Sequence, residues 1–338
     1  MPIVIRQANL EQELTDVAET VNASFNCRLP LDRFQWLYKA NPDGPATAWV
    51  AIDDSSGQIV GTTAVCPRRV RIGGTPRPVI AWNCCDFSIR SGYRTLGAAI
   101  KLRRAARVGV DAGQSQFLYA HPNDRMLAIH LQVGHRPLGK MVRHAKLLRT
   151  SSGVRAVDRV ASIAFRAVGS DQWRRSNQDA ELMEQWPLSE LDTLFEDASH
   201  RLGTAVVRDS RYLQWRFRQN PLERGEMIVA RRHGRLTGYL IFTVKQEIGV
   251  VKDWLAVDTS SVEALFQHLI VEMRRRDAPS ISVTALESHP DLTRLTALGF
   301  LRRPDTTTAV VYANPDLADS RMVTNSSAWY MTFGDRDV

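Results

Sequence analysis

The chain has 338 residues, of which 44% are hydrophobic and 24% are charged, and this length and globular composition predict two compact domains. No apolar run is long enough to cross a bilayer and the N-terminal residues lack the layout of a secretory signal, so we expect a cytoplasmic protein. The net charge of +8 favours anionic partners, but the basic runs carry neither interleaved aromatic residues nor a nucleic-acid motif, so no nucleic-acid partner is expected.

Strands and helices alternate along residues 1–150, because apolar residues recur there at strand or helix spacing. The predicted strands are residues 3–6, 47–52, 58–65, 68–72, 79–89, 117–120 and 141–148. The predicted helices are residues 10–25, residues 34–38, a segment from about 97 to 110, and residues 125–132, which Gly134 ends. This alternation predicts an α/β fold.

The second half of the chain repeats landmarks of the first. Trp36, Asn41, Pro42, Gly61 and Gly134 recur in the same order as Trp215, Asn220, Pro221, Gly238 and Gly299. Several matches in one order, separated by similar lengths of chain, indicate an internal duplication. We therefore predict a first domain in residues 1–150 and a second copy of the same fold in residues 196–338.

Residues 151–195 are predicted to form a basic linker between the copies. Within it, segment 154–166 is apolar on one face and basic on the other. Such a helix packs on a neighbouring domain with its arginines in solvent, or it lies on an anionic membrane surface. We favour the first arrangement, so peripheral membrane contact is an alternative rather than the expectation.

The turn after the strand 79–89 is the best candidate for a ligand site. Ser91 and Gly92 interrupt the apolar run, and Gly97 and Ala98 lie where the next helix begins. A helix N-terminus carries unpaired N–H groups and a partial positive charge, and small residues let a diphosphate approach the backbone. The alternative is an ordinary strand-to-helix turn in which a small residue serves packing.

The spacing Arg94-x-x-Gly97-x-Ala99 resembles the Arg/Gln-x-x-Gly-x-Gly/Ala signature of the GNAT superfamily of acyl-CoA N-acyltransferases. In that family the turn binds the pyrophosphate of coenzyme A, and the order of elements resembles the family across residues 1–150. The resemblance implies two tandem GNAT-like domains, each a mixed, mostly antiparallel twisted sheet flanked by helices. It implies that the coenzyme contacts are made by Ile89, Arg94, Thr95, Leu96, Gly97, Ala98, Ala99 and Asn123.

The two copies differ at this turn. In the second copy residues 258–264 contain no glycine, and Asp258 and Glu263 would repel a diphosphate. We therefore expect coenzyme A to bind the first domain only.

Two residues are candidates for proton transfer. Members of the family often carry a tyrosine four residues before the glycine that ends the helix after the fifth strand, and His130 stands at that position. A histidine there can protonate the leaving thiolate, or it merely forms a hydrogen bond on the helix surface. Asp86 is the only carboxylate on the strand that leads to the turn; it can accept the amine proton or bind an ammonium group, or it forms a salt bridge with an arginine.

The four cysteines, Cys27, Cys66, Cys84 and Cys85, fit neither a disulfide framework nor a zinc spacing, and no metal site is expected. Small buried thiols are the simpler interpretation, and a nucleophilic cysteine is the alternative. Adjacent Cys84 and Cys85 are expected on opposite faces of a strand.

These features predict an N-acyltransferase that moves an acyl group directly from acetyl-CoA or another acyl-CoA to a small-molecule amine. The closing Trp-Tyr-x-x-x-Gly-Asp segment resembles acyltransferases of bacterial polysaccharide-biosynthesis clusters, which favours an amino sugar as acceptor. A non-catalytic binding protein is one alternative. An aminoacyl transferase of the peptidoglycan-bridge type is another, although its tRNA-borne donor has no diphosphate for the turn to bind. The sequence specifies neither the acyl length nor the oligomeric state.

Overall fold

The computed structural model describes residues 3–337 apart from 26, 74, 76, 150–178, 315, 318 and 319. The amphipathic segment 154–166 lies outside the described residues. None of the helices in the described ranges is both long and apolar enough to cross a membrane.

The first half has the order of elements that the sequence predicted. Its elements are β1 Ile3–Gln7, α1 Leu14–Phe25, α2 Leu31–Tyr38, β2 Thr47–Asp53, β3 Ile59–Arg71, β4 Val79–Ile89, the short turn η1 Ser91–Tyr93, α3 Leu96–Asp111, β5 Phe117–Ala120, α4 Asp124–Gln132 and β6 Arg136–Leu147. The strands predicted at 58–65 and 68–72 are one strand, β3. Pro67 does not interrupt it because Pro67 lies beyond Val65, where pairing with β2 ends.

The second half has a similar order of elements, with the short strand β8 inserted between its first two helices and a closing segment added at its end. Its elements are β7 Asp179–Met183, α6 Leu188–Ser199, β8 Thr204–Val206, α7 Ser210–Leu213, η3 Gln214–Arg218, β9 Glu226–Arg232, β10 Arg235–Lys245, β11 Ile248–Ala256, α8 Thr259–Arg275, β12 Ser280–Leu286, α9 Leu292–Ala297, β13 Leu301–Ala313, α10 Ser320–Thr324, η4 Ser326–Ala328, β14 Trp329–Tyr330 and η5 Phe333–Asp335. The repeat begins earlier than predicted, since β7 and part of α6 lie within 151–195. Among the described strands β7 is an edge strand that pairs with β9, and none of its residues is fully buried. The alternation of apolar and polar residues in β7 is therefore too weak to predict a strand from the sequence.

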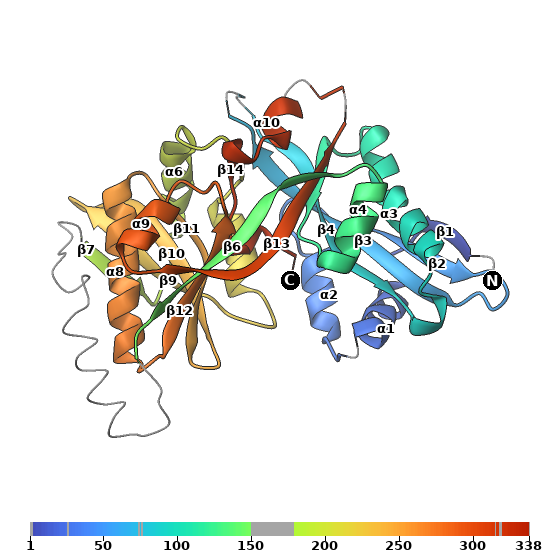
Figure 1. The fold of residues 1–338 in the computed structure, drawn as a ribbon, viewed down its shortest axis with the longest axis horizontal. Helices are drawn as coiled ribbons and strands as arrows, with labels where there is room; N and C mark the ends of the chain where they lie inside the picture. The colour runs from blue at the N-terminus through green and yellow to red at the C-terminus, as the bar shows by residue number, and fades with distance from the viewer. Residues whose placement is uncertain are drawn as a thin grey trace.

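The described strands form one continuous sheet in the order β1-β2-β3-β4-β5-β13-β6-β12-β11-β10-β9-β7, with β8 and β14 attached beside β3 (Figure 1). Neighbours along this order are antiparallel except β4 with β5 and β11 with β12, which are parallel. The predicted class, a mixed and mostly antiparallel twisted sheet flanked by helices, is confirmed.

The two halves exchange a strand at the centre of this sheet. β6 of the first half pairs with β12 of the second over seven residues, and β13 of the second half pairs with β5 of the first. β6 and β13 also pair with each other, and Figure 1 shows both crossing the middle of the molecule. The halves are therefore joined by main-chain hydrogen bonds as well as by side-chain packing.

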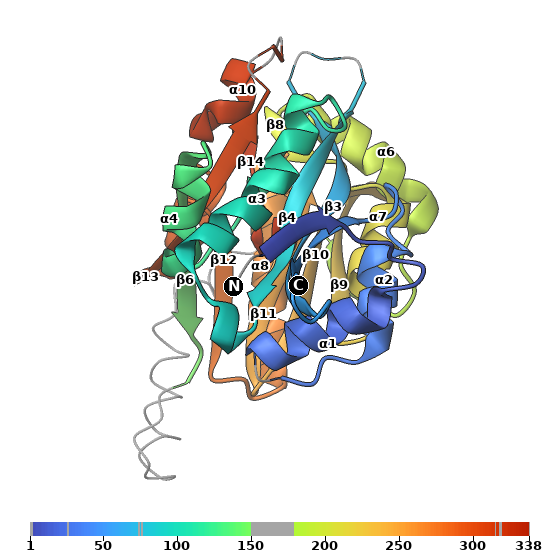
Figure 2. The same ribbon diagram turned by 90° about the vertical axis from the view of Figure 1, so that its right-hand side faces the viewer.

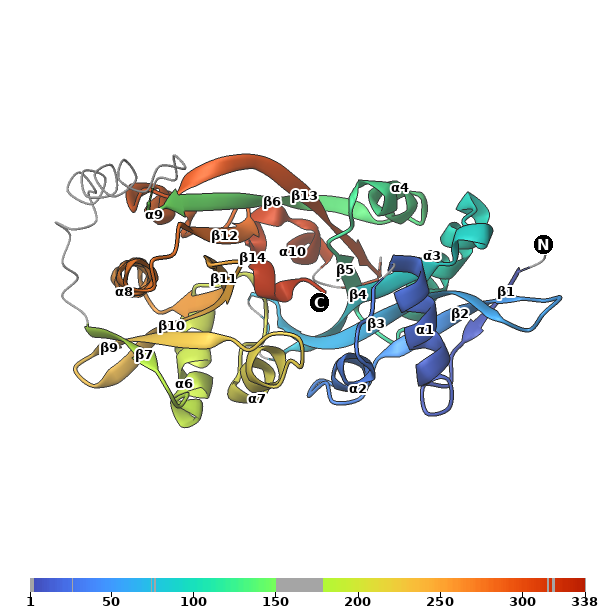
Figure 3. The ribbon, with the colours of Figure 1, turned by 90° about the horizontal axis from the view of Figure 1, so that it is seen from below.

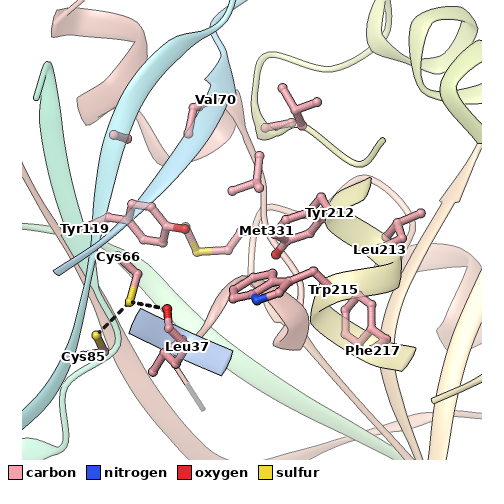
Figure 4. Close-up of a cluster of buried hydrophobic side chains, with 14 of the residues drawn as sticks. Leu37, Cys66, Val70, Cys85, Tyr119, Tyr212, Leu213, Trp215, Phe217 and Met331 are labelled. Carbon is pink, nitrogen blue, oxygen red and sulfur yellow. Dashed lines mark hydrogen bonds between the residues drawn. The ribbon is translucent and has the colours of Figure 1, made fainter. Parts of the chain in front are cut away.

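The repeated tryptophans meet at the junction of the halves. Trp36 of α2 and Trp215 of η3 stack with ring centroids 4.9 Å apart, and each indole nitrogen donates to the other residue's backbone carbonyl, at 2.8 and 3.0 Å. Around them, side chains from both halves form one buried cluster (Figure 4), including Leu37, Tyr119, Tyr212 and Met331. The two landmarks thus serve one local symmetric contact.

Helices cover both faces of the first-half strands. Figures 2 and 3 place α1 and α2 on one face and α3 and α4 on the other. Cys85 packs in the core cluster with α1 and α2, whereas Cys84 packs in the cluster with α3, so these thiols face opposite sides as expected. Cys27 is half-buried, unlike the other three, and the Cys66 and Cys85 sulfurs are 3.2 Å apart.

Candidate functional site

Strands β4 and β5 run side by side only at their beginnings. Their parallel pairing covers Ala81 to Asn83 in β4 and Phe117 to Tyr119 in β5, beyond which no pairing joins them. Asp86 has a φ of 45° and lies where the register with β3 shifts, so a bulge bends the free end of β4. The strands diverge there and open a cleft in the sheet.

A cavity of about 840 Å³ occupies this cleft. Its walls come from the end of α1, the divergent part of β4, the first two turns of α3, the β5–α4 connection, α4, and the pair Arg336 and Asp337. The predicted residues that line it are Asp86, Ile89, Arg94, Thr95, Leu96, Ala99, Asn123 and His130. Gly97 and Ala98 belong to the same turn without contributing to the wall. The fold therefore brings the candidates from both sequence arguments to one cavity.

The turn before α3 has an open helix N-terminus. Thr95 is the N-cap, and its hydroxyl accepts a hydrogen bond from the Ala98 N–H at 3.2 Å. A β-carbon placed on Gly97 would meet no atom within 4 Å, so the glycine is not needed for packing. Arg94 donates to the carbonyls of Ile89, at 3.0 Å, and Ser24, at 2.8 Å, which holds the turn against α1. The free space beside Gly97 thus adjoins unpaired N–H groups of the first helical turn.

Asp86 forms the ion pair that the sequence left as its alternative role. The fully buried Arg33 binds both carboxylate oxygens, at 2.9 Å for Nη2 to Oδ1, and the Tyr38 hydroxyl donates to Oδ2 at 2.8 Å. Burial, and then the Asp86 charge, raise the pKa of Tyr38, so its proton stays on this hydrogen bond. Asp86 borders the cavity with partners already in place.

His130 is 2% exposed, with its ring edge-on to that of His135 at 4.4 Å. Burial lowers its pKa well below the usual value, and the charge of Arg103 and the His135 ring lower it further. The imidazole is therefore neutral at physiological pH. It can offer an N–H hydrogen bond, but not the proton of an imidazolium, which differs from the acid role that the sequence suggested.

Asn123 is the N-cap of α4, and its side-chain oxygen accepts from the Met126 N–H at 3.0 Å. Its carbonyl is thus committed to the helix, and only its amide NH₂ remains to donate to a ligand.

Two groups on the cavity wall were missed by sequence reasoning. Arg103 lies on the buried face of α3. An arginine among the apolar residues of that face could have indicated a functional residue from the sequence. Asp337 comes from the closing segment, which returns from the second half, and no local pattern pointed to it. The residue lines the cavity, and desolvation by the surrounding protein and then the charge of Asp86 raise its pKa.

The equivalent opening in the second half is closed. β11 and β12 also pair over only three residues, but Trp254 at the free end of β11 is fully buried and its ring packs at a tilt against that of His289, with centroids 4.6 Å apart. The Tyr330 hydroxyl donates to the Trp254 carbonyl at 2.6 Å and completes the plug. Asp258 caps α8 with its carboxylate, which puts negative charge where the first half has a neutral threonine.

No protein-family profile matches the sequence, and no curated protein is detectably similar to it. Solved structures share the fold. One is a conserved protein of unknown function from Enterococcus faecalis V583, described as a probable N-acyltransferase, with a TM-score of 0.69, 12% identity, and coverage of 94% of this chain and 74% of that one. Another is a GCN5-related N-acetyltransferase from Anabaena variabilis, with a TM-score of 0.67, 14% identity, and coverage of 93% and 73%.

A third is Saccharomyces cerevisiae N-myristoyltransferase with bound myristoyl-CoA, with a TM-score of 0.58, 12% identity, and coverage of 98% of this chain and 85% of that one. At these identities the likeness establishes the fold. The chain thus has the architecture of GCN5-related N-acetyltransferases over nearly its whole described length.

Proposed function

We propose that this protein is an acyl-CoA-dependent N-acyltransferase that transfers an acyl group directly to a small-molecule amine. The observation that carries the proposal is a cavity that joins the open N-terminus of α3 to the buried carboxylate of Asp86 on β4 and to Asp337 of the closing segment. An extended donor with a diphosphate at one end and a thioester at the other matches such a site. Acetyl-CoA is the first donor to test, and the sequence resemblance favours an amino sugar as acceptor.

Direct transfer needs the amine to lose a proton and the leaving thiolate to be stabilised. Asp337 has the raised pKa and the access of a general base, and Asp86 stands close enough to affect it. We assign the base to Asp337, and to Asp86 the holding of Arg33 and Tyr38 beside the acceptor. His130 is assigned the hydrogen bond to the departing sulfur, donated from its neutral ring.

The second half has a supporting role in this proposal. Its cleft is plugged by Trp254, and it contributes Arg336 and Asp337 to the cavity of the first half. One coenzyme per chain is expected.

The coenzyme site is tested by introducing a negative charge into the turn before α3. Gly97→Glu should weaken coenzyme A binding at least tenfold by calorimetry, because the new carboxylate occupies the open space beside the diphosphate site. Val108→Glu is the matched control, since Val108 is 54% exposed further along the same helix. Unchanged affinity in a folded Gly97→Glu protein would show that the turn does not hold the coenzyme.

A binding protein without catalysis would pass that test. Incubation with acetyl-CoA and a panel of amino sugars, followed by mass spectrometry of the acceptors, separates the two functions. An N-acylated product whose formation stops in Gly97→Glu supports the enzyme. Tight coenzyme binding with no product from any amine class would favour the non-catalytic alternative.

A further inference from the structure

Arg103 is a buried cation with no counter-charge among the described residues. Its side chain is 1% exposed, and its Nε and Nη1 atoms are buried without a hydrogen-bond partner. Among the described residues, the guanidinium lies over the Phe87 ring, whose centroid is 5.4 Å away. Burying a charge in this way destabilises the folded state, because the hydration that the guanidinium loses is not replaced by an ion pair.

The neighbours of Arg103 on each packed element offer no negative charge. His130 and His135, on and just after α4, are neutral because their pKa values are lowered, for His135 to about 3, by burial and by Arg103 itself. On α3, Arg107 already pairs with Asp111. On β4, Asp86 is held by Arg33 and Tyr38. Asp337 of the closing segment lines the same cavity but forms no ion pair with Arg103 among the described residues, so the guanidinium is available to an anion that enters the cavity.

That anion is separate from the diphosphate of the coenzyme. Arg103 lies six residues after Gly97, which places it about 9 Å further along the axis of α3 at 1.5 Å per residue. It faces the interior of the same cavity, between α3 and α4, with Cys84, Phe87 and Ile129 on the wall around it. One ligand that starts at the turn can thus reach Arg103 with its other end.

We propose that Arg103 binds a carboxylate on the acyl group of the donor, so that the substrate is a dicarboxylic acyl-CoA. The inference rests on the proposed function and specifies its donor. A guanidinium presents paired N–H groups that match a carboxylate bidentately, and an apolar wall makes a full negative charge a stronger partner there than an amide or thioester oxygen. The position of Arg103 on α3, the helix that begins at the turn, assigns the carboxylate to the donor rather than to the acceptor.

The experiment compares donors of equal chain length with and without the terminal carboxylate. Dissociation constants are measured for malonyl-CoA against propionyl-CoA and for succinyl-CoA against butyryl-CoA, with desulfo-CoA as the common reference without an acyl group. In the wild-type protein the dicarboxylic donors should bind at least tenfold more tightly than their partners. Arg103→Met should remove that preference while leaving desulfo-CoA affinity within about threefold, because the turn is untouched.

Stability of the free protein gives an independent readout. Arg103→Met should unfold at the same or a higher temperature than wild type, since it removes an unpaired buried charge and keeps the length of the side chain. Arg107→Met is the matched control, because it breaks an ion pair on the same helix and should leave donor preference unchanged. Arg103→Lys keeps the charge and should retain part of the preference.

Three results would overturn the inference. Equal affinities within each donor pair in the wild type would show that no carboxylate is recognised. An equal loss for all donors in Arg103→Met would place the guanidinium on the sulfur or the pantetheine arm instead. Destabilisation by Arg103→Met with unchanged preference would make Arg103 structural. Absence of desulfo-CoA binding is a different outcome, because it would remove the proposed function and the inference with it.

Discussion

Each half has a buried aspartate near the end of the strand that precedes its long helix, and the two aspartates have similar partners. Asp86 and Asp253 each stand three residues before the end of the corresponding strand, β4 or β11. Asp253 is bound by the buried Arg208 and accepts from the Tyr239 hydroxyl at 2.7 Å, as Asp86 is bound by Arg33 and Tyr38. Because the second half has no open cleft, this arrangement serves the fold, and we assign Asp86 a positioning role.

This assignment predicts opposite effects of one substitution at two carboxylates. Asp86→Asn should destabilise the protein by about 3–5 kcal/mol, because it removes the negative charge that the buried Arg33 faces. Asp337→Asn should stabilise it at neutral pH. Since the folded state raises the pKa of Asp337, it holds the proton more tightly than the unfolded chain, and stability falls as pH rises through that interval.

The assignment of Asp337 as the base also predicts how the rate of turnover depends on pH. A base with a raised pKa loses its charge at a higher pH than an ordinary carboxyl, so kcat/KM should fall as the pH falls through that value. Asp337→Asn should be slower by about a hundredfold and lack this acidic limb. Denaturant unfolding and pH–rate profiles check both parts, and a stable Asp86→Asn protein without activity would instead make Asp86 the base.

At the scale of elements, α2 and η3 join the two halves through a direct contact. Their tryptophans stack and exchange hydrogen bonds to backbone carbonyls. Each tryptophan therefore makes its main contact with the other half of the chain rather than within its own half.

Truncation of this contact should affect the whole protein. Trp36→Ala should lower the free energy of unfolding by about 3–5 kcal/mol, whereas Trp36→Phe, which keeps a ring and loses one hydrogen bond, should cost less. Urea unfolding followed by circular dichroism measures both. An unchanged midpoint in Trp36→Ala would show that the junction does not depend on the stack.

The described strands of both halves form one sheet, because β6 pairs with β12 and β13 of the second half and β13 pairs with β5 and β6 of the first. A separated half would expose strand edges that the intact chain covers, which promotes aggregation. Residues 1–149 and 179–338 should therefore fail to fold when each is produced alone, and should form a soluble complex when produced together. Size-exclusion chromatography and circular dichroism test this, and two independently folded fragments would contradict it.

Local patterns in the sequence determined most elements and the candidate turn. Period-two and helical spacing depend on near neighbours, and the landmarks Trp36 and Trp215 predicted related orders of elements in the two halves without coordinates. The chemistry of the turn at Gly97 is equally local, because it depends on a helix N-terminus and a small residue.

Only the tertiary structure decided how these parts meet. Alternation specifies which face of β6 is buried, not which strand it pairs with, so the exchange with β13 could not be predicted. The sequence also could not predict that Trp254 closes the second cleft or that Asp86 pairs with Arg33. Nor could it predict that Arg103 and Asp337 line one cavity. These contacts join residues distant in the chain, and the burial that lowers the pKa of His130 is a property of the packed molecule rather than of its neighbours in sequence.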